Sequence, residues 1–117
     1  MALEYVSGPE FVFANDSIVV SVLNTGGLAA SARILINHES GGTSVAVVDT
    51  GTTSLNPGAS FGFSVSMLAS GFYWIQIFVS SNEVVSSAQF VRLQGTEIVI
   101  VASYTPGSFA TFDRKRV

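Results

Sequence analysis

The sequence predicts an all-β fold: a two-sheet antiparallel β-sandwich of about seven to nine strands, with a short arm at each end. Three observations predict it. No window of about 11 to 18 residues places apolar side chains at helical spacing opposite a charged face. Val, Ile, Phe, Ser, Thr and Gly dominate, and these residues favour strands and turns. Turn-forming clusters interrupt the chain about every 8 to 12 residues, as is typical of a sandwich or barrel.

The first four strands are expected at residues 10–14, 17–23, 29–38 and 44–50. The turn clusters that separate them are 15–16 (ND), 24–27 (NTGG) and 40–42 (SGG). Asn, Asp and Gly favour turns because they tolerate the backbone conformations that turns need. In the third strand, Ile34 and Ile36 point opposite to Arg33, which predicts one buried face.

The last four strands are expected at residues 59–67, 72–80, 87–93 and 97–104. The turns around them are 56–58 (NPG), 70–71 (SG), 81–82 (SN) and 94–95 (QG). The strand at 59–67 alternates most clearly, because large apolar side chains share one face while Gly and Ser share the other. The residues predicted in the core are Ile34, Ile36, Phe61, Phe63, Val65 and Trp74.

Two of these strands lack a polar face. Residues 72–79 are largely apolar on both faces, and residues 98–102 contain no polar side chain. A two-sheet sandwich buries one face of each sheet, so we expect the second faces to be covered by the arms or by another copy of the chain. The expected domain spans 9–107, with an N-terminal arm at 1–8 and a C-terminal arm at 108–117 that carries a basic tail.

The composition excludes several classes of function. The net charge of −3 argues against a general nucleic-acid binder. No apolar run approaches the roughly 18 residues that span a bilayer. The chain has no Cys, which excludes disulfides, thiolate nucleophiles and Cys-ligated metals. The first residues lack the charged and apolar segments of a signal peptide.

Three candidate chemical motifs are better explained as structural features. Residues 58–62 (GASFG) match the G-x-S-x-G elbow, but a strand follows Ser60 where that motif needs a helix. His38 and Glu39 supply too few ligands for a metal ion. The third candidate is a calcium site formed by Asp16, Asp49 and Glu83, which lie in or beside turns. The chain contains no D-x-D-x-D-G run, and Asp is common in turns. We therefore predict no catalytic residue, no metal site, no cofactor and no enzymatic activity.

Four segments carry a family resemblance: 18–26 (IVVSVLNTG), 29–36, 55–60 (LNPGAS) and 71–75 (GFYWI), with 82–84 following the last. Together they resemble immunoglobulin-like, adhesion-type sandwich modules of the CARDB kind. The resemblance implies a non-catalytic module of surface or extracellular proteins, with an immunoglobulin-like or jelly-roll-like sandwich. A weaker likeness is to bacterial spore-appendage subunits, which are small β-sandwich chains. Those subunits carry Cys in their arms, so their covalent cross-linking is not implied here.

Two functions remain open. The first is a structural subunit that assembles with itself into a filament or coat on a cell or spore surface, or outside the cell. The low charged fraction of the chain, 11%, favours this first hypothesis. The second is a monomeric module that binds carbohydrate or protein. Under the first, the expected assembly residues are Leu3, Tyr5, Val6, Tyr73, Ile98, Ile100, Arg114, Lys115 and Arg116. The N-terminal arm is expected to add to a neighbouring copy.

Overall fold

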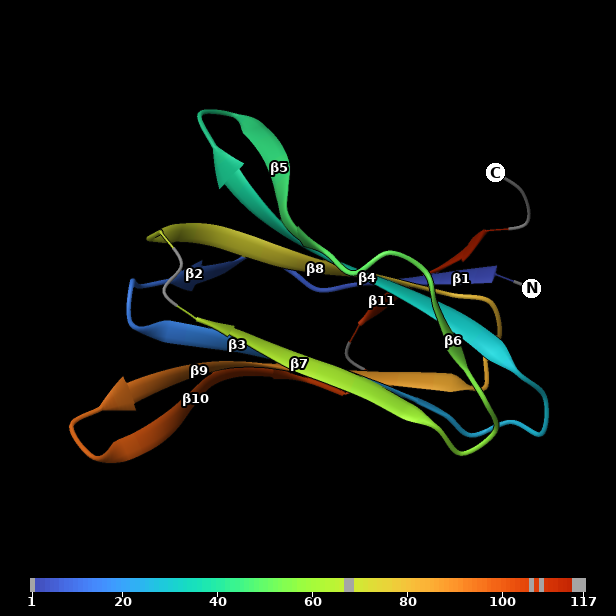
Figure 1. The fold of residues 1–117 in the computed structure, drawn as a ribbon. Coiled ribbons are helices and arrows are strands. Elements are labelled where there is room, and N and C mark those ends of the chain that lie inside the picture. Colours follow the sequence, from blue (N-terminus) through green and yellow to red (C-terminus); the bar gives the residue numbers. More distant parts are fainter. Residues whose placement is uncertain (1, 67–68, 106, 108, 115–117) are drawn as a thin grey trace.

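The described part of the chain is an antiparallel β-sandwich, which confirms the predicted fold class (Figure 1). The structure is a computed structural model and describes residues 2–66, 69–105, 107 and 109–114. Within these residues the elements are eleven strands, with no helix and thus no membrane-spanning helix. They are β1 (Ala2–Val6), β2 (Glu10–Val12), β3 (Asp16–Asn24), β4 (Ala30–Ser40), β5 (Thr43–Asp49), β6 (Thr53–Leu55), β7 (Ser60–Ser66), β8 (Gly71–Val79), β9 (Val84–Gln94), β10 (Glu97–Tyr104) and β11 (Ala110–Arg114).

The strands form a larger and a smaller sheet. The larger has the order β11-β1-β8-β4-β5, with β2 also paired to β8 and β6 to β4. The smaller has the order β10-β9-β3-β7. All eight expected strands are present, with ends within three residues of the prediction. The count exceeds seven to nine because both arms are strands and because the three-residue β6 was not predicted.

The core lies between the sheets and is built by alternation. Every second residue of β3, from Asp16 to Asn24, is buried, while the residues between them face away from the core. Ile34 and Ile36 of β4 are fully buried, as predicted. The predicted core residues of β7, Phe61, Phe63 and Val65, are only half-buried but pack against the core. They lie on an edge strand, which has a neighbour on one side only.

The prediction that Trp74 lies in the core is wrong, because β8 turns its odd-numbered residues, and not Trp74, toward the core. Tyr73, Ile75 and Ile77 face the core, opposite His38, Ile36 and Ile34 of β4. Trp74 therefore lies on the outer face of the larger sheet, where its indole Nε1 donates a hydrogen bond to Ser44 Oγ at 2.9 Å.

The expected N-terminal arm is not free in this structure. β1 is a strand of the larger sheet, between β8 and β11. Leu3 and Tyr5 face inward and are buried in the chain's own core. Ser7 continues the pairing, since its amide donates to Ile75 O and its hydroxyl accepts from Ile75 N. The C-terminal arm likewise forms β11 at the edge of the same sheet.

A buried amide ties three loops together at the end of the sandwich that carries the termini (Figure 1). The Asn24 side-chain nitrogen donates to Leu28 O and Leu55 O at 2.9 and 3.0 Å. Its side-chain oxygen accepts from Gly26 N at 2.9 Å. The next residue, Thr25, bonds to Glu83 O through both its amide and its hydroxyl. The NTG segment is therefore a structural clamp.

Two hairpins project from the opposite end (Figure 1). The β4–β5 turn has Gly41 and Gly42 at φ of 60° and 84°, as a type I′ turn requires. The β9–β10 turn has Gly95 at φ of 64°. Glycine takes these values without steric cost, so both hairpins reverse tightly.

Candidate functional site

The outer face of the smaller sheet carries no charged side chain. Its four strands contain three charged residues, Asp16, Arg92 and Glu97. Asp16 is buried on the core side and is opposite Arg92. Arg92 is in turn opposite Val99, which shares its side of β10 with Glu97. Because residues directly opposite in a sheet share a face, all three lie on the inward side.

Small hydroxyl and β-branched residues fill this outer face. Across the sheet, the register places side by side Ser66–Ser17–Val91–Ile100, Ser64–Val19–Gln89–Ser103, Gly62–Ser21–Ser87 and Ser60–Leu23–Val85. The hydroxyls of Ser21 and Ser87 are 2.8 Å apart. A Cβ at Gly62 would lie 3.2 Å from Ser21 Cβ, so Gly62 permits the strands to approach closely. We call this surface the neutral face.

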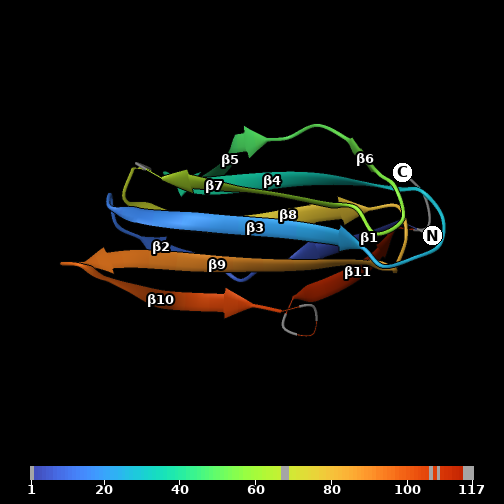
Figure 2. The same cartoon turned by 60° about the horizontal axis from the view of Figure 1, so that its bottom comes forward.

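The neutral face ends at β10, whose second edge is unpaired among the described strands (Figure 2). Exposure is high on both sides of this strand: 72% for Ile98, 36% for Val99, 53% for Ile100 and 40% for Val101. A bulge between Ile100 and Ala102 interrupts the regular pairing with β9, which resumes at Ala102 and continues to Tyr104. Sheet edges in monomeric proteins are usually protected by Lys, Pro or charge, and residues 98–104 contain none of these.

Two contacts on the inward side hold the β9–β10 hairpin to the rest of the sandwich. Arg92 Nε and Nη2 each donate to an Asp16 carboxylate oxygen at 2.9 Å, and the guanidinium lies 4.5 Å from the Phe13 ring centroid. These bonds hold the pKa of the Asp16 carboxyl below its ordinary value. At the other end of β10, the Tyr104 hydroxyl bonds to Glu10. Burial first, and this bond second, raise the pKa of Tyr104 to about 12.

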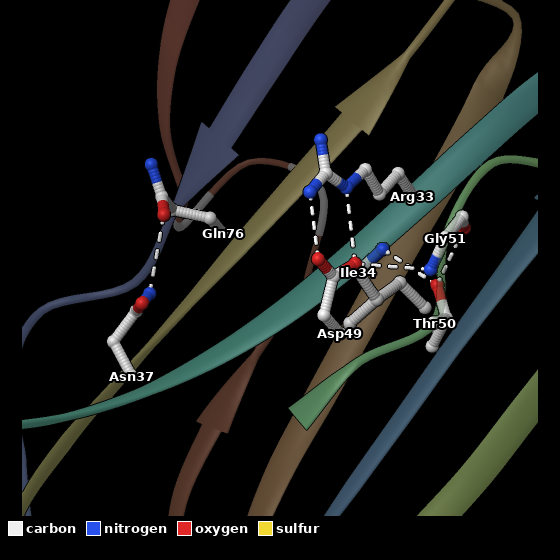
Figure 3. Close-up of polar contacts among 7 residues, drawn as sticks. All are labelled: Arg33, Ile34, Asn37, Asp49, Thr50, Gly51 and Gln76. Carbon is white, nitrogen blue, oxygen red and sulfur yellow. Dashed lines mark hydrogen bonds and ion pairs between the residues drawn. The ribbon is translucent and has the colours of Figure 1, made fainter. Parts of the chain in front are cut away.

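The outer face of the larger sheet is different, because it is charged (Figure 3). Arg33 donates two hydrogen bonds to Asp49, at 3.0 and 2.6 Å, and the Asp49 carboxylate also accepts from Gly51 N. Arg33 first, and Gly51 second, lower the pKa of Asp49 to about 2. Asn37 donates to Gln76, which donates in turn to Glu4 at 2.6 Å.

Three phenylalanines cluster at the hairpin end of the larger sheet. The ring centroids of Phe11 and Phe13 are 5.0 Å apart, and those of Phe11 and Phe72 are 5.2 Å apart, both edge to face. All three side chains are exposed. This cluster is the second candidate surface.

The structure distributes the predicted assembly residues among different environments. Ile98 and Ile100 are exposed on the neutral face. Leu3, Tyr5 and Tyr73 are core residues, and Val6 is half-buried. Tyr73 is therefore not a surface residue, and its neighbour Phe72 takes that place. Arg114 belongs to β11, while Lys115 and Arg116 lie outside the described residues.

The motifs interpreted as structural take part in strands and turns. Ser60 is the first residue of β7 and is opposite Leu23. His38 belongs to β4, where it is half-buried and stacks on Tyr73 with ring centroids 4.4 Å apart. Asp16 and Asp49 each accept a hydrogen bond from a backbone amide of the adjacent turn.

The comparisons with known proteins support the fold alone. No protein-family model matches the chain, and the search of curated proteins gave no match. The chain is similar in structure to the crystal structure of Thermotoga maritima 1070, with a TM-score of 0.63 and 13% sequence identity. The similarity covers 87% of this chain and 90% of that protein.

Proposed function

We propose that this protein is a non-enzymatic structural subunit that assembles with copies of itself, in a filament or coat on a surface or outside the cell. The observation that carries the proposal is the neutral face. All three charges of the smaller sheet point inward, and the outward side presents only Ser, Gln, Gly and aliphatic residues.

The physical argument compares this face with an ordinary exposed one. About 25 to 35% of a typical soluble surface is charged, with both signs interspersed. A neutral face lacks the charges that oppose association. When another neutral surface packs on it, no charged group is removed from water, so association has no desolvation penalty for buried charges. The same face of a second copy is such a neutral surface. Whether the assembly is closed or extends as a filament depends on the symmetry of the contact between copies.

Light scattering of the full chain from dilute to concentrated solution tests the proposal. We expect the mean mass to rise with concentration, and Val19→Lys, which puts a charge at the middle of the neutral face, to lower it. Leu28→Lys is the matched control, because Leu28 is exposed in the loop between β3 and β4. A chain that stays monomeric throughout contradicts the proposal.

The exposed phenylalanine cluster favours the second candidate, a monomeric module that binds carbohydrate or protein. Exposed aromatic rings grouped at one end of a sandwich offer stacking surfaces for a ligand. Phe72→Ala would then abolish binding to an oligosaccharide or peptide ligand and leave the oligomeric state unchanged. A monomeric wild-type chain whose binding depends on Phe72 would replace the assembly proposal.

A further inference from the structure

We propose that β10 strands of two copies pair antiparallel across a two-fold axis normal to the sheet, centred on Val99. This inference rests on the proposed self-association and specifies where it occurs. The two four-stranded sheets would then form one continuous sheet across the pair. None of the described strands pairs with the second edge of β10, so this edge supplies backbone donors and acceptors to a further strand, and its side chains are apolar on both faces from Ile98 to Val101.

Charge favours a second copy as the partner of this edge. Residues 98–104 contain no charged side chain and Glu97 lies at the end of the strand, so the edge offers no counter-charge to an acidic peptide strand and a single one to a basic strand. Another edge strand, β5, also exposes Val45 and Val47, but it is flanked by carboxylates. Glu39 is opposite Ser44, and Asp49 ends the strand in its ion pair with Arg33. Two β5 edges would bring these charges together, whereas two β10 edges need not.

The pattern of faces selects the register. Ile98 and Ile100 point to the neutral face and Val99 points inward, so an antiparallel pair must place outward residues opposite outward residues. Centring on Val99 does this, with Ile98 opposite Ile100 of the second copy. Centring on Ile100 fails, because it puts Ile98 opposite Ala102, which the bulge turns inward.

The remaining register, centred on Ile98, is disfavoured by like charges. In that register Glu97 is opposite Val99 of the second copy, so the two Glu97 residues are offset by two positions, about 7 Å along the strand. Centring on Val99 offsets them by four positions, about 13 Å. The larger offset reduces their repulsion and lengthens the apolar seam.

Cysteine cross-linking tests the axis, and the chain is suited to it because it contains no Cys. Directly opposite Cα atoms in an antiparallel pair lie about 4.5 to 5.5 Å apart. Disulfides form at Cα separations of about 4.4 to 6.8 Å. We therefore expect Val99→Cys to give a covalent dimer under mild oxidation. Ile98→Cys is the register control, since its two copies are offset along the seam, and Val45→Cys is the control for the exposed edge of β5.

A non-covalent measurement completes the test. Ile100→Lys brings a charge onto the seam, and we expect it to shift the dimer to monomer at concentrations where Val45→Lys does not. Val45 has the same kind of position, exposed by 55% on a hairpin edge strand. Circular dichroism confirms that each variant keeps its strands.

The outcomes separate this inference from the proposed function. A wild-type chain that is monomeric at every concentration overturns both. A wild-type chain that assembles while Val99→Cys cross-links no faster than Val45→Cys overturns the β10 pairing alone. Faster cross-linking of Ile98→Cys than of Val99→Cys overturns the register.

Discussion

Asn24→Ala is the sharpest test of how the loops at the terminal end are held. The substitution removes the two hydrogen bonds donated to Leu28 O and Leu55 O and the one accepted from Gly26 N. Each such bond contributes about 0.5 to 1.5 kcal/mol net, and the Leu55 carbonyl would lose this buried partner. The expected loss in free energy of unfolding is therefore about 2 to 4 kcal/mol.

The assay is equilibrium urea unfolding followed by circular dichroism, at one fixed protein concentration because association adds to apparent stability. Asn82→Ala is the matched control, since Asn82 is an exposed loop residue and its loss is expected to stay within about 0.5 kcal/mol. If both variants lose equal stability, or if Asn24→Ala loses less than about 1 kcal/mol, the clamp does not hold the loops as the hydrogen bonds indicate.

Three further predictions concern the body of the sandwich. Phe63→Ala should cost about 2 kcal/mol in urea unfolding, below the 3 to 5 typical of a fully buried phenylalanine, because Phe63 is half-buried on an edge strand; a full-sized loss would contradict its edge position. Asp16 has a lowered pKa, so the stability that its pairing with Arg92 supplies is present above the ordinary value of 3.8 and is lost as pH falls through the folded value. The free energy of unfolding should therefore fall less between pH 5 and pH 2 in Asp16→Asn than in the wild type. Equal slopes of this free energy against pH would refute the prediction. Tyr104 has its pKa raised to about 12, so stability should fall as pH rises from 10 through 12, and Tyr104→Phe should remove that part of the fall.

The turns made the strands predictable, because Gly, Asn, Asp and Pro mark the places where strands must end. The β10 strand has the predicted bounds, 97–104, since Gly95 precedes it and Pro106 follows soon after it. Residues 53–55 gave no such signal, because a three-residue strand is too short to show alternation.

The orientation of β8 was the main error in the predicted core. Both faces of this strand carry large apolar side chains, so alternation alone does not decide between Tyr73 and Trp74 as core residues. Gln76 held the deciding signal. It shares a face with Trp74, so a buried Trp74 would have required burying an amide among aliphatic side chains.

The location of the arms could not be predicted for a different physical reason. Leu3 and Tyr5 alternate with Glu4, a pattern that fits a strand in the chain's own sheet and a strand in a neighbour's sheet equally well. The neutral face could not be predicted from the sequence either. It depends on the register that aligns four strands, and only that register shows that Asp16, Arg92 and Glu97 share the inward side.

The response to salt distinguishes association through the neutral face and the β10 edge from association through the basic tail. Contacts through the neutral face and the β10 edge involve no attraction between opposite charges, and both Glu97 at the end of β10 and the chain's net charge of −3 add only repulsion. Raising the salt from about 0.1 M to about 1 M shortens the Debye length from about 10 to about 3 Å, which weakens that repulsion. We therefore expect the mean mass in light scattering to hold or rise with salt. The basic residues 114–116 give the opposite expectation, because attraction between this tail and an acidic neighbour weakens with salt. Replacing these three residues by Ser is the control; because it changes the net charge from −3 to −6 (2 basic against 8 acidic residues), the comparison is made at about 1 M salt, where the added repulsion is screened and the mass should be unchanged. Assemblies that dissociate with salt, and that the Ser variant fails to form, would show that the tail and not the neutral face joins the copies.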